Sequence, residues 1–344
     1  MKGTTIHLDT FAGRLAAARL RDGLLDDLLI APDEGTPLLG AIYRATVDRV
    51  VKGHGGAMLR LPEGTAYLKG AKGLQPGDSL QVQVTGYAEP GKAVPVTDRP
   101  LFKSRFAIAT PGKPGFNVSR QIRDDDLRDS LLELAHDTLG PPADVGLILR
   151  SAAAEGDPDE IAADIMAMTE LAQQVAKDGT RDPQLLVDGT DPHTEAWREW
   201  PLPDALYTEP GTFRTNGIDE MIEALRSPRV DLPGDHWISV EPTRALVAVD
   251  VNTGADASLA AGLKANIATA RALPAALRCR GLGGQIVIDM APAPKKDRRQ
   301  IEHALRAAFR ADPVDTVLAG WTPLGHFELQ RKRERLPLHQ ILEG

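Results

Sequence analysis

The chain of 344 residues is predicted to be an α/β protein that combines a small closed β-barrel with a separate, helix-covered sheet. Three observations predict this class. The length corresponds to about two domains of roughly 150 residues each. Short runs rich in Val, Thr and Tyr follow one another between residues 38 and 97, separated by Gly/Pro turns. From Ile218 onward, apolar strand-like runs alternate with helical segments of ten or more residues.

The N-terminal half is predicted to contain the barrel, two helices and a buried strand. Residues 38–97 are expected to close into a barrel because closure removes exposed strand edges, and the runs AIYRATVDRVV, AMLRL, TAYLK and SLQVQVTG would supply its strands. An oligonucleotide-binding barrel and a chromo- or SH3-like barrel fit this pattern about equally well. Residues 100–115, rich in Pro, Gly and Lys, are expected to be a linker. Helices are predicted over 124–139 and 158–177, with a buried strand, VGLILR, between them.

The C-terminal half is expected to form the helix-covered sheet. Residues 178–210 are polar, and their pattern predicts no element. The later segments are predicted in order as helix IDEMIEALRS, strands HWISVEP and ALVAVDV, a long helix over 259–278 interrupted by Pro274, strand QIVIDM, a helix over 298–311 and strand VDTVLAGW.

Charge and cysteine content exclude several classes of protein. The formal net charge of −8 argues against a protein that simply coats nucleic acid, although local basic patches remain compatible with it. Cys279 is the only cysteine, which excludes an internal disulfide and a multi-cysteine zinc site and favours a reducing, cytoplasmic location. No apolar run approaches the ~20 residues of a membrane span. The N-terminus lacks the apolar stretch of a secretory signal.

The strongest chemical signal is a set of polar residues at two predicted strand ends. Asp250 and Asn252 lie two apart in ALVAVDVNTG, so both side chains face the same side of a strand. Asp289 ends the next predicted strand. If these strands are parallel neighbours, the three side chains meet at the edge where α/β sheets place their sites, and their oxygens suit Mg²⁺. The alternative is that each Asp caps the segment that follows it.

Other motifs are weaker signals. The run Gly281–Gly284 resembles a phosphate loop but follows a helix, so a helix C-cap is favoured. The pair His136–Asp137 resembles part of a metal phosphohydrolase site but lacks partner histidines. Of two basic runs, 295–299 reads as a solvated helix start, whereas for 331–335 phosphate contact and a solvated surface remain open.

Taken together, RALVAVDVNTG followed by RGLGGQIVIDM closely resembles the catalytic core of the ribonuclease E/G family, and the resemblance spans nearly the whole chain. LGAIYRATVDRVV, GGAMLRL and TAYLKG are similar to that family's S1 RNA-binding barrel. FNVSRQI and VGLILRSA resemble its 5′-end sensor, and GHFELQRKR resembles the segment that closes its catalytic subdomain.

The resemblance implies roles for individual residues. Asp250 and Asp289 would bind the catalytic Mg²⁺, for which Mn²⁺ could substitute, and Asn252 would contact the reacting phosphate or its water. Arg150 and Ser151 would hold a 5′-monophosphate. In the barrel, Tyr67 would stack on a base, whereas Met58 stands where the family usually has Phe. The remaining residues implied to contact RNA are Lys92, Arg120, Arg331 and Arg333.

The resemblance also implies an order of subdomains. An RNase H-like region is expected over 1–35 and, shortened, over 186–232. An S1-type OB barrel over 36–99 and a 5′-sensor over 100–185 would be inserted in it, and a DNase I-like catalytic α/β subdomain would follow over 233–344. The paired cysteines of the larger members' zinc link do not occur in this sequence, so no structural zinc is expected. We therefore expect a monomer or dimer in place of a zinc-linked tetramer.

The function expected from the resemblance is Mg²⁺-dependent endonucleolytic cleavage of single-stranded RNA with preference for a 5′-monophosphate, in RNA processing or decay. Its products would carry 5′-phosphate and 3′-hydroxyl ends. One alternative is an RNA-binding protein on the same scaffold with weak or no nuclease activity. Another is a metal-dependent phosphatase or DNase that shares only the α/β core, against which the predicted barrel argues.

Overall fold

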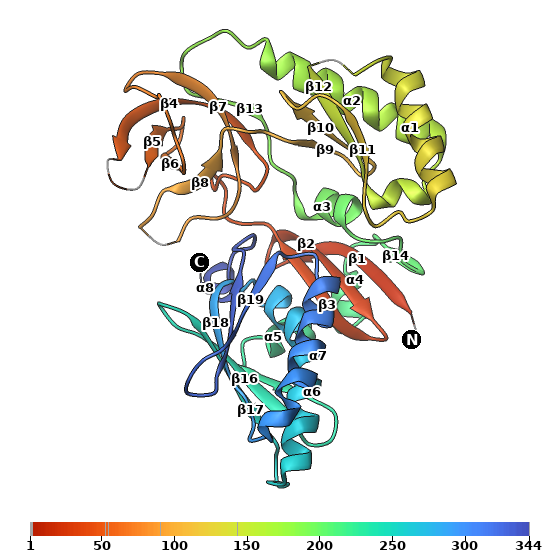
Figure 1. Ribbon diagram of the computed structural model, residues 1–344, viewed down its shortest axis with the longest axis vertical. Coiled ribbons are helices and arrows are strands. Elements are labelled where there is room, and N and C mark those ends of the chain that lie inside the picture. The colour runs from red at the N-terminus through yellow and green to blue at the C-terminus, as the bar shows by residue number, and fades with distance from the viewer. Residues whose placement is uncertain (1–2, 52, 54, 90, 143, 344) are drawn as a thin grey trace. The chain divides into compact units, whose positions relative to one another are not determined.

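The computed structural model describes residues 3–51, 53, 55–89, 91–142 and 144–343, which divide into two compact units (Figure 1). Unit 1 combines the first 34 residues with Pro203–Gly344, and unit 2 is the continuous stretch Gly35–Leu202. The chain therefore begins in unit 1, builds unit 2 as an insertion and returns to complete unit 1. No helix in the described part of the chain is long and apolar enough to cross a bilayer.

A closed five-stranded barrel forms the first half of unit 2. Its strands follow the order β4-β5-β6-β8-β7, and β7 pairs back onto β4. Alternate side chains such as Ala57, Leu59, Ala66 and Leu68 fill the interior. This confirms the predicted barrel and is consistent with an OB-type fold. The strands are β4 (Ile42–Val51), β5 (Gly56–Arg60), β6 (Thr65–Leu68), β7 (Ser79–Val84) and β8 (Val94–Thr97), with β13 (Gln184–Val187) added beside β4.

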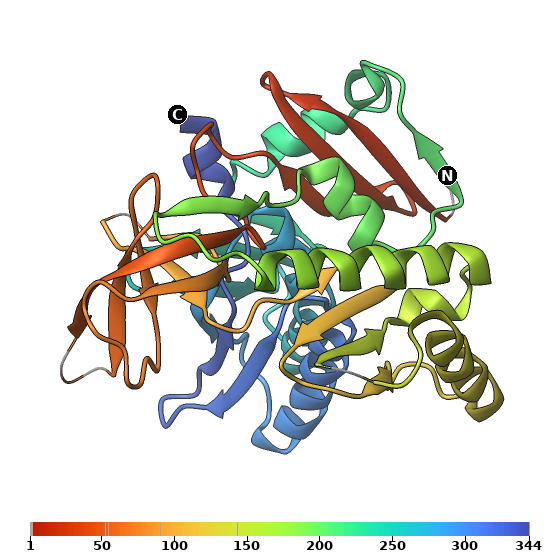
Figure 2. The ribbon, with the colours of Figure 1, turned by 90° about the horizontal axis from the view of Figure 1, so that it is seen from above.

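The second half of unit 2 is a four-stranded sheet in the order β11-β12-β10-β9. The long helix α2 packs on β10 and β12 (Figure 2). The predicted helices are confirmed, and Asp124 caps α1 by accepting a hydrogen bond from the backbone N–H of Leu127 at 3.1 Å. The elements are β9 (Phe102–Lys103), β10 (Ala107–Pro111), β11 (Phe116–Val118), α1 (Asp125–Leu139), β12 (Val145–Leu149), the 3₁₀ turn η1 (Ser151–Ala154), α2 (Pro158–Ala176) and α3 (Pro192–Glu199).

The prediction of a linker over 100–115 is wrong. This segment contains β9 and β10, and β10 pairs antiparallel with β12, Ala107 opposite Leu149. Its Pro, Gly and Lys content is typical of a linker, but pairing with a strand nearly forty positions later satisfies its backbone hydrogen bonds. Residues 186–202, expected in the RNase H-like connection, group by their contacts with unit 2.

The N-terminal sheet of unit 1 has the order β14-β1-β2-β3. Asp22 and Gly23, both at positive φ (52° and 81°), form the tight turn between β2 and β3, in the manner of an Asp-Gly hairpin. Helices α4 and α5 pack against it, with Phe213, Ile218 and Ile222 in the shared core. The elements are β1 (Thr4–Phe11), β2 (Arg14–Arg21), β3 (Leu24–Ile30), β14 (Ala205–Tyr207), α4 (Thr212–Thr215) and α5 (Ile218–Ala224).

The C-terminal sheet of unit 1 has the order β15-β16-β17-β18-β20-β19. Only β17 and β18 pair in parallel, because α6 carries the chain back between them. Ser258 caps α6, and α6 and α7 cover one face of the sheet (Figure 1). The elements are β15 (Arg229–Asp231), β16 (Trp237–Pro242), β17 (Val247–Asn252), α6 (Leu259–Cys279), β18 (Gly284–Asp289), η2 (Lys295–Asp297), α7 (Arg298–Ala311), β19 (Thr316–Trp321), β20 (Phe327–Arg331) and α8 (Leu338–Glu343).

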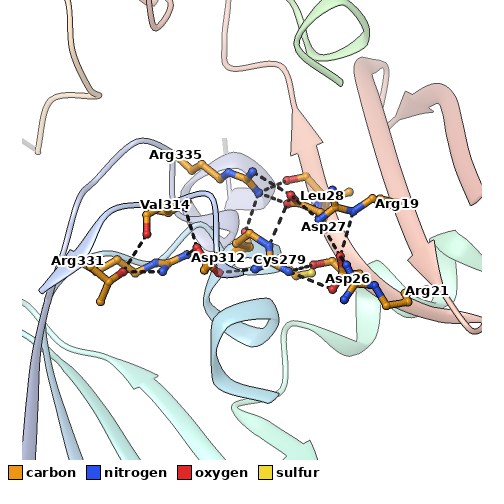
Figure 3. Close-up of polar contacts among 12 residues, drawn as sticks. Arg19, Arg21, Asp26, Asp27, Leu28, Cys279, Asp312, Val314, Arg331 and Arg335 are labelled. Carbon is orange, nitrogen blue, oxygen red and sulfur yellow. Dashed lines mark hydrogen bonds and ion pairs between the residues drawn. The ribbon is translucent and has the colours of Figure 1, made fainter. Parts of the chain in front are cut away.

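A buried ion cluster ties the two sheets of unit 1 together (Figure 3). Asp27 of β3 pairs with Arg335, and its second oxygen lies 3.5 Å from Nε of Arg278. Arg278, at the end of α6, also pairs with Asp312. The side chains of both aspartates are fully buried. A buried charge is costly unless it is paired, and each of these carboxylates has at least one arginine partner.

Candidate metal centre and RNA-contacting residues

Asp250 and Asp289 lie side by side at the C-terminal ends of the two parallel strands. They are direct partners in the register of β17 and β18. In β17 the buried positions Val249 and Val251 flank Asp250, so the carboxylate is on the face opposite the helices and is exposed. Asp289 is likewise exposed, after buried Ile288. The sheet therefore places two carboxylates on one accessible face.

Two further side chains contact this pair. The amide nitrogen of Asn252 donates a hydrogen bond to Asp250 Oδ2 at 2.9 Å, which leaves the Asn252 amide oxygen facing away from that contact. Nδ1 of His326, in the turn before β20, lies 3.2 Å from Oδ1 of Asp289. The His326 side chain is only 36% exposed, and its Nδ1 makes no well-aligned hydrogen bond. Among the described residues Nδ1 of His326 thus approaches the Asp289 carboxylate without a hydrogen bond to another group.

The donor set fits a hard divalent cation. In the described part of the chain no Lys or Arg pairs with Asp250 or Asp289, so no permanently charged side chain offsets their negative charge. The described residues include no group of three or more His, Cys, Asp and Glu side chains arranged to hold a metal. Mg²⁺ is commonly bound by one or two carboxylates and completes its shell with waters and substrate phosphates, which matches this arrangement.

Arg150 and Ser151 lie at the end of β12, as predicted. Nη1 of Arg150 donates to the backbone oxygens of Ser104 at 2.7 Å and Arg198 at 3.2 Å, and Nη2 pairs with the carboxylate of Glu199. The Arg150 side chain is 19% exposed, whereas Ser151 is exposed. The guanidinium is therefore held rigidly and already has an anionic partner within the protein.

Tyr67 lies on the outer surface of the barrel. Its neighbours in β6, Ala66 and Leu68, point into the core, and Tyr67 itself is half-buried. It is the cross-strand partner of Met58, and its ring lies over Gly56, where a Cβ atom would come within 2.4 Å of the phenolic oxygen. Gly56 therefore leaves the space in which the tyrosine ring lies flat along the barrel.

The other residues implied to contact RNA differ in their surroundings. Lys92 is 67% exposed and pairs with Glu89 at 2.8 Å. Arg120, just after β11, and Arg333, beside Gly284, are exposed. The expectation for Arg331 is wrong. Its side chain is 1% exposed, and it pairs with Asp312 at 3.1 Å and donates to Thr316 Oγ1 at 2.9 Å. Arg331 is a buried structural residue and is not available to RNA (Figure 3).

Sequence reasoning missed two residues that border these sites, His326 and Glu199. His326 is 37 positions after Asp289, and Glu199 is 49 positions after Arg150. A histidine within GHFELQRKR was a detectable signal for the first. For Glu199 the sequence held none, since the surrounding segment gave no predicted element and the pairing is non-local.

Comparisons with known proteins agree with the motifs. The profile of the Ribonuclease E/G family matches residues 102–205 and 203–334. A ribonuclease E from Nostoc sp. is 28% identical over 385 residues, which cover 94% of this chain and 55% of that protein. A ribonuclease E from Synechocystis sp. is 26% identical over 89% of this chain and 54% of its own length. Escherichia coli ribonuclease G is 24% identical over 94% of this chain and 79% of its own length.

The chain spans about half the length of the two cyanobacterial proteins that it matches. The family profile nevertheless covers most of the sequence, including both strands that carry the paired aspartates and the strand that ends at Arg150. On this evidence the chain belongs to the ribonuclease E/G family.

Proposed function

We propose that this protein is a metal-dependent endoribonuclease that cleaves single-stranded RNA, with preference for a 5′-monophosphate, in RNA processing or decay in the cytoplasm. The observation that carries the proposal is the register of Asp250 and Asp289, two exposed carboxylates on neighbouring parallel strands that pair with no Lys or Arg among the described residues. Membership of the ribonuclease E/G family supports the same activity.

Asp250 and Asp289 would hold Mg²⁺, or Mn²⁺ in its place, and a cation bound there supplies a polarised water and offsets charge on the reacting phosphate. Asn252 donates a hydrogen bond to Asp250 and would contact the reacting phosphate or its water. Water adds to phosphorus and the bond to the 3′ oxygen breaks, which leaves 5′-phosphate and 3′-hydroxyl ends. Tyr67, Lys92, Arg120 and Arg333 would contact the strand, and Arg150 with Ser151 its 5′ end.

A single assay tests the activity. Purified protein is incubated with 5′-monophosphorylated RNA, the same RNA with a 5′-hydroxyl, and DNA of matched sequence, each with Mg²⁺ or with EDTA. We expect cleavage of RNA only, in Mg²⁺ only, and faster for the monophosphate. Cleavage of DNA at a similar rate would support the phosphatase or DNase alternative, and equal rates for the two RNAs would remove the 5′ preference alone.

The alternative is an RNA-binding protein with weak or no nuclease activity. It is favoured by the shortened connection over 186–232 and by the absence from this sequence of the paired cysteines of the zinc link. Specific RNA binding without cleavage in any Mg²⁺ or Mn²⁺ concentration would establish this alternative.

The contribution of the barrel is tested at Tyr67. Stacking of an aromatic ring on a base contributes roughly 1–3 kcal/mol, so Tyr67→Ala should weaken binding of single-stranded RNA by about tenfold. Because the ring packs on Gly56, thermal melting is measured beside the titration. Unchanged RNA affinity in a folded variant would remove Tyr67 from the binding surface.

For assembly, we propose a monomer or a dimer without structural zinc, since the sequence contains a single cysteine, Cys279, and it is buried. Light scattering with and without EDTA, combined with zinc analysis, tests this. A tetramer that dissociates on chelation would contradict it.

A further inference from the structure

The guanidinium of Arg150 has one side fixed by backbone and one side paired with an acid. Nη1 donates to the carbonyl oxygens of Ser104 and Arg198, whereas Nη2 pairs with Glu199 and with no other described residue. Arg198 is one residue from the end of α3, so Arg150 also caps that helix by binding a carbonyl oxygen of its last turn. The two hydrogen bonds of Nη1 therefore hold Arg150 in the fold, and a ligand that binds at Nη2 would leave them intact.

Glu199 is shared between two arginines. Its Oε2 accepts from Arg150, and its Oε1 accepts from Nε of Arg198 at 2.7 Å. Burial alone would raise the pKa of Glu199, but Arg150 and Arg198 outweigh burial and lower the pKa below its ordinary value. The carboxylate is therefore ionised at neutral pH. It is also 31% exposed, so solvent reaches the contact.

Glu199 is in an unfavourable position for the helix that carries it. It is the last residue of α3, where the helix dipole is negative and a carboxylate destabilises the helix. A third arginine, Arg105, stacks on Trp197 at 4.3 Å and donates to the Trp197 backbone oxygen. Two arginines, Arg150 and Arg198, thus pair with one carboxylate, and this excess of positive charge favours an anion of higher charge.

We propose that the carboxylate of Glu199 occupies the position at Nη2 of Arg150 that a terminal phosphate of RNA would take, and that Glu199 thereby sets the selectivity for the 5′ end. This inference rests on the proposed recognition of a 5′-monophosphate. A phosphate monoester carries more charge and more acceptor oxygens than a carboxylate, so it displaces Glu199, whereas a 5′-hydroxyl does not. Ser151, which is exposed, directly follows Arg150 in the sequence.

The test measures binding without cleavage. A fluorescent single-stranded oligoribonucleotide, labelled at its 3′ end, is prepared with a 5′-monophosphate and with a 5′-hydroxyl, and both are titrated in EDTA. The measured quantity is the dissociation constant of the 5′-hydroxyl RNA divided by that of the 5′-monophosphate RNA, so a ratio above one means preference for the monophosphate. For Glu199→Gln we expect this ratio to rise about fivefold, through tighter binding of the monophosphate alone, as the loss of a partly exposed competing ion pair would give.

Matched variants distinguish competition between Glu199 and the phosphate from a general effect of removing a negative charge and from loss of the position of Arg150. Glu155→Gln removes the same charge six residues after the end of β12, from an exposed side chain, and should leave the ratio unchanged. Glu199→Asp keeps the charge on a shorter side chain, and an intermediate ratio is expected. Adding Arg150→Gln to Glu199→Gln should bring the ratio to about one.

Three results would overturn the inference. A wild-type ratio above one that Glu199→Gln leaves unchanged, or lowers, means that Glu199 only positions Arg150, and the proposed 5′ preference survives. Equal tightening for both RNAs in Glu199→Gln and Glu155→Gln means a general charge effect. Ratios of one in every variant mean that Arg150 recognises no phosphate, while cleavage in Mg²⁺ separately decides the nuclease assignment.

Discussion

Two pairs of aspartates in unit 1 have opposite surroundings. Asp27 and Asp312 are fully buried, and arginines from distant parts of the chain pair with them. Asp250 and Asp289 lie next to each other on an exposed face, where Asn252 donates a hydrogen bond to Asp250 and His326 approaches Asp289. Buried carboxylates require a cationic partner from the fold itself, whereas exposed ones can be left for a cation from solution. The same residue type is therefore structural in one place and available for chemistry in the other.

The largest expected effect is on cleavage. Asp250→Asn or Asp289→Asn should slow Mg²⁺-dependent RNA cleavage by about a thousandfold or more, because a bound cation contributes several kcal/mol to the transition state. RNA affinity in EDTA should barely change. The control is Asp231→Asn on β15 of the same sheet, 77% exposed and paired with Arg229, which should cleave normally. Near wild-type cleavage rates for both Asp250→Asn and Asp289→Asn would show that these carboxylates do not hold the catalytic cation.

An Asp→Asn substitution in the buried pair should lower the unfolding free energy, whereas in the exposed pair it should lower the rate of cleavage. Asp312→Asn leaves Arg331 and Arg278 without their shared carboxylate, and breaking such a buried pair costs about 3–5 kcal/mol of unfolding free energy. For exposed Asp289→Asn the change in metal-free protein should stay within about 0.5 kcal/mol. Urea denaturation of the two variants measures the contrast, and similar losses would contradict it.

A smaller effect is expected at His326, the side chain that distinguishes Asp289 from Asp250. Outer contacts that orient a metal-binding carboxylate commonly change metal affinity or activity by about 10–100-fold. His326→Leu should therefore raise the Mn²⁺ concentration needed for half-maximal cleavage by about tenfold. His303→Leu, an exposed histidine on α7, is the control. An unchanged Mn²⁺ requirement would show that the 3.2 Å approach has no functional consequence.

The smallest expected effect is the pH dependence of the buried cluster. Burial raises the pKa of Asp27, but Arg335, Arg278 and Arg19 outweigh burial and lower the pKa below its ordinary value of 3.8. Because the folded-state pKa is depressed, the contribution of Asp27 to stability is present above pH 3.8 and is lost as the pH falls through the lower folded value. The difference in unfolding free energy between wild type and Asp27→Asn should narrow on acidification. A constant difference from pH 6 to pH 3 would refute this.

Much of the local structure follows from the sequence alone. Asp124 and Ser258 precede helical patterns and cap the predicted helices, since these interactions span only three residues. The pairing of Asp250 with Asp289 was also predictable, because a long intervening helix is the connection that parallel neighbours require. The Asp22–Gly23 turn carried a readable hairpin signal.

Only the tertiary structure decided the rest. Residues 102–111 look like a linker until β12 supplies their hydrogen-bond partners. Arg331 belongs to a basic run, yet the register of β20 turns its side chain toward buried Asp312. Glu199 meets Arg150 and His326 meets Asp289 only after distant segments pack. The physical reason is that capping and side-chain periodicity act within a few residues, whereas burial and the pairing of charges depend on chain segments that only the completed fold brings together.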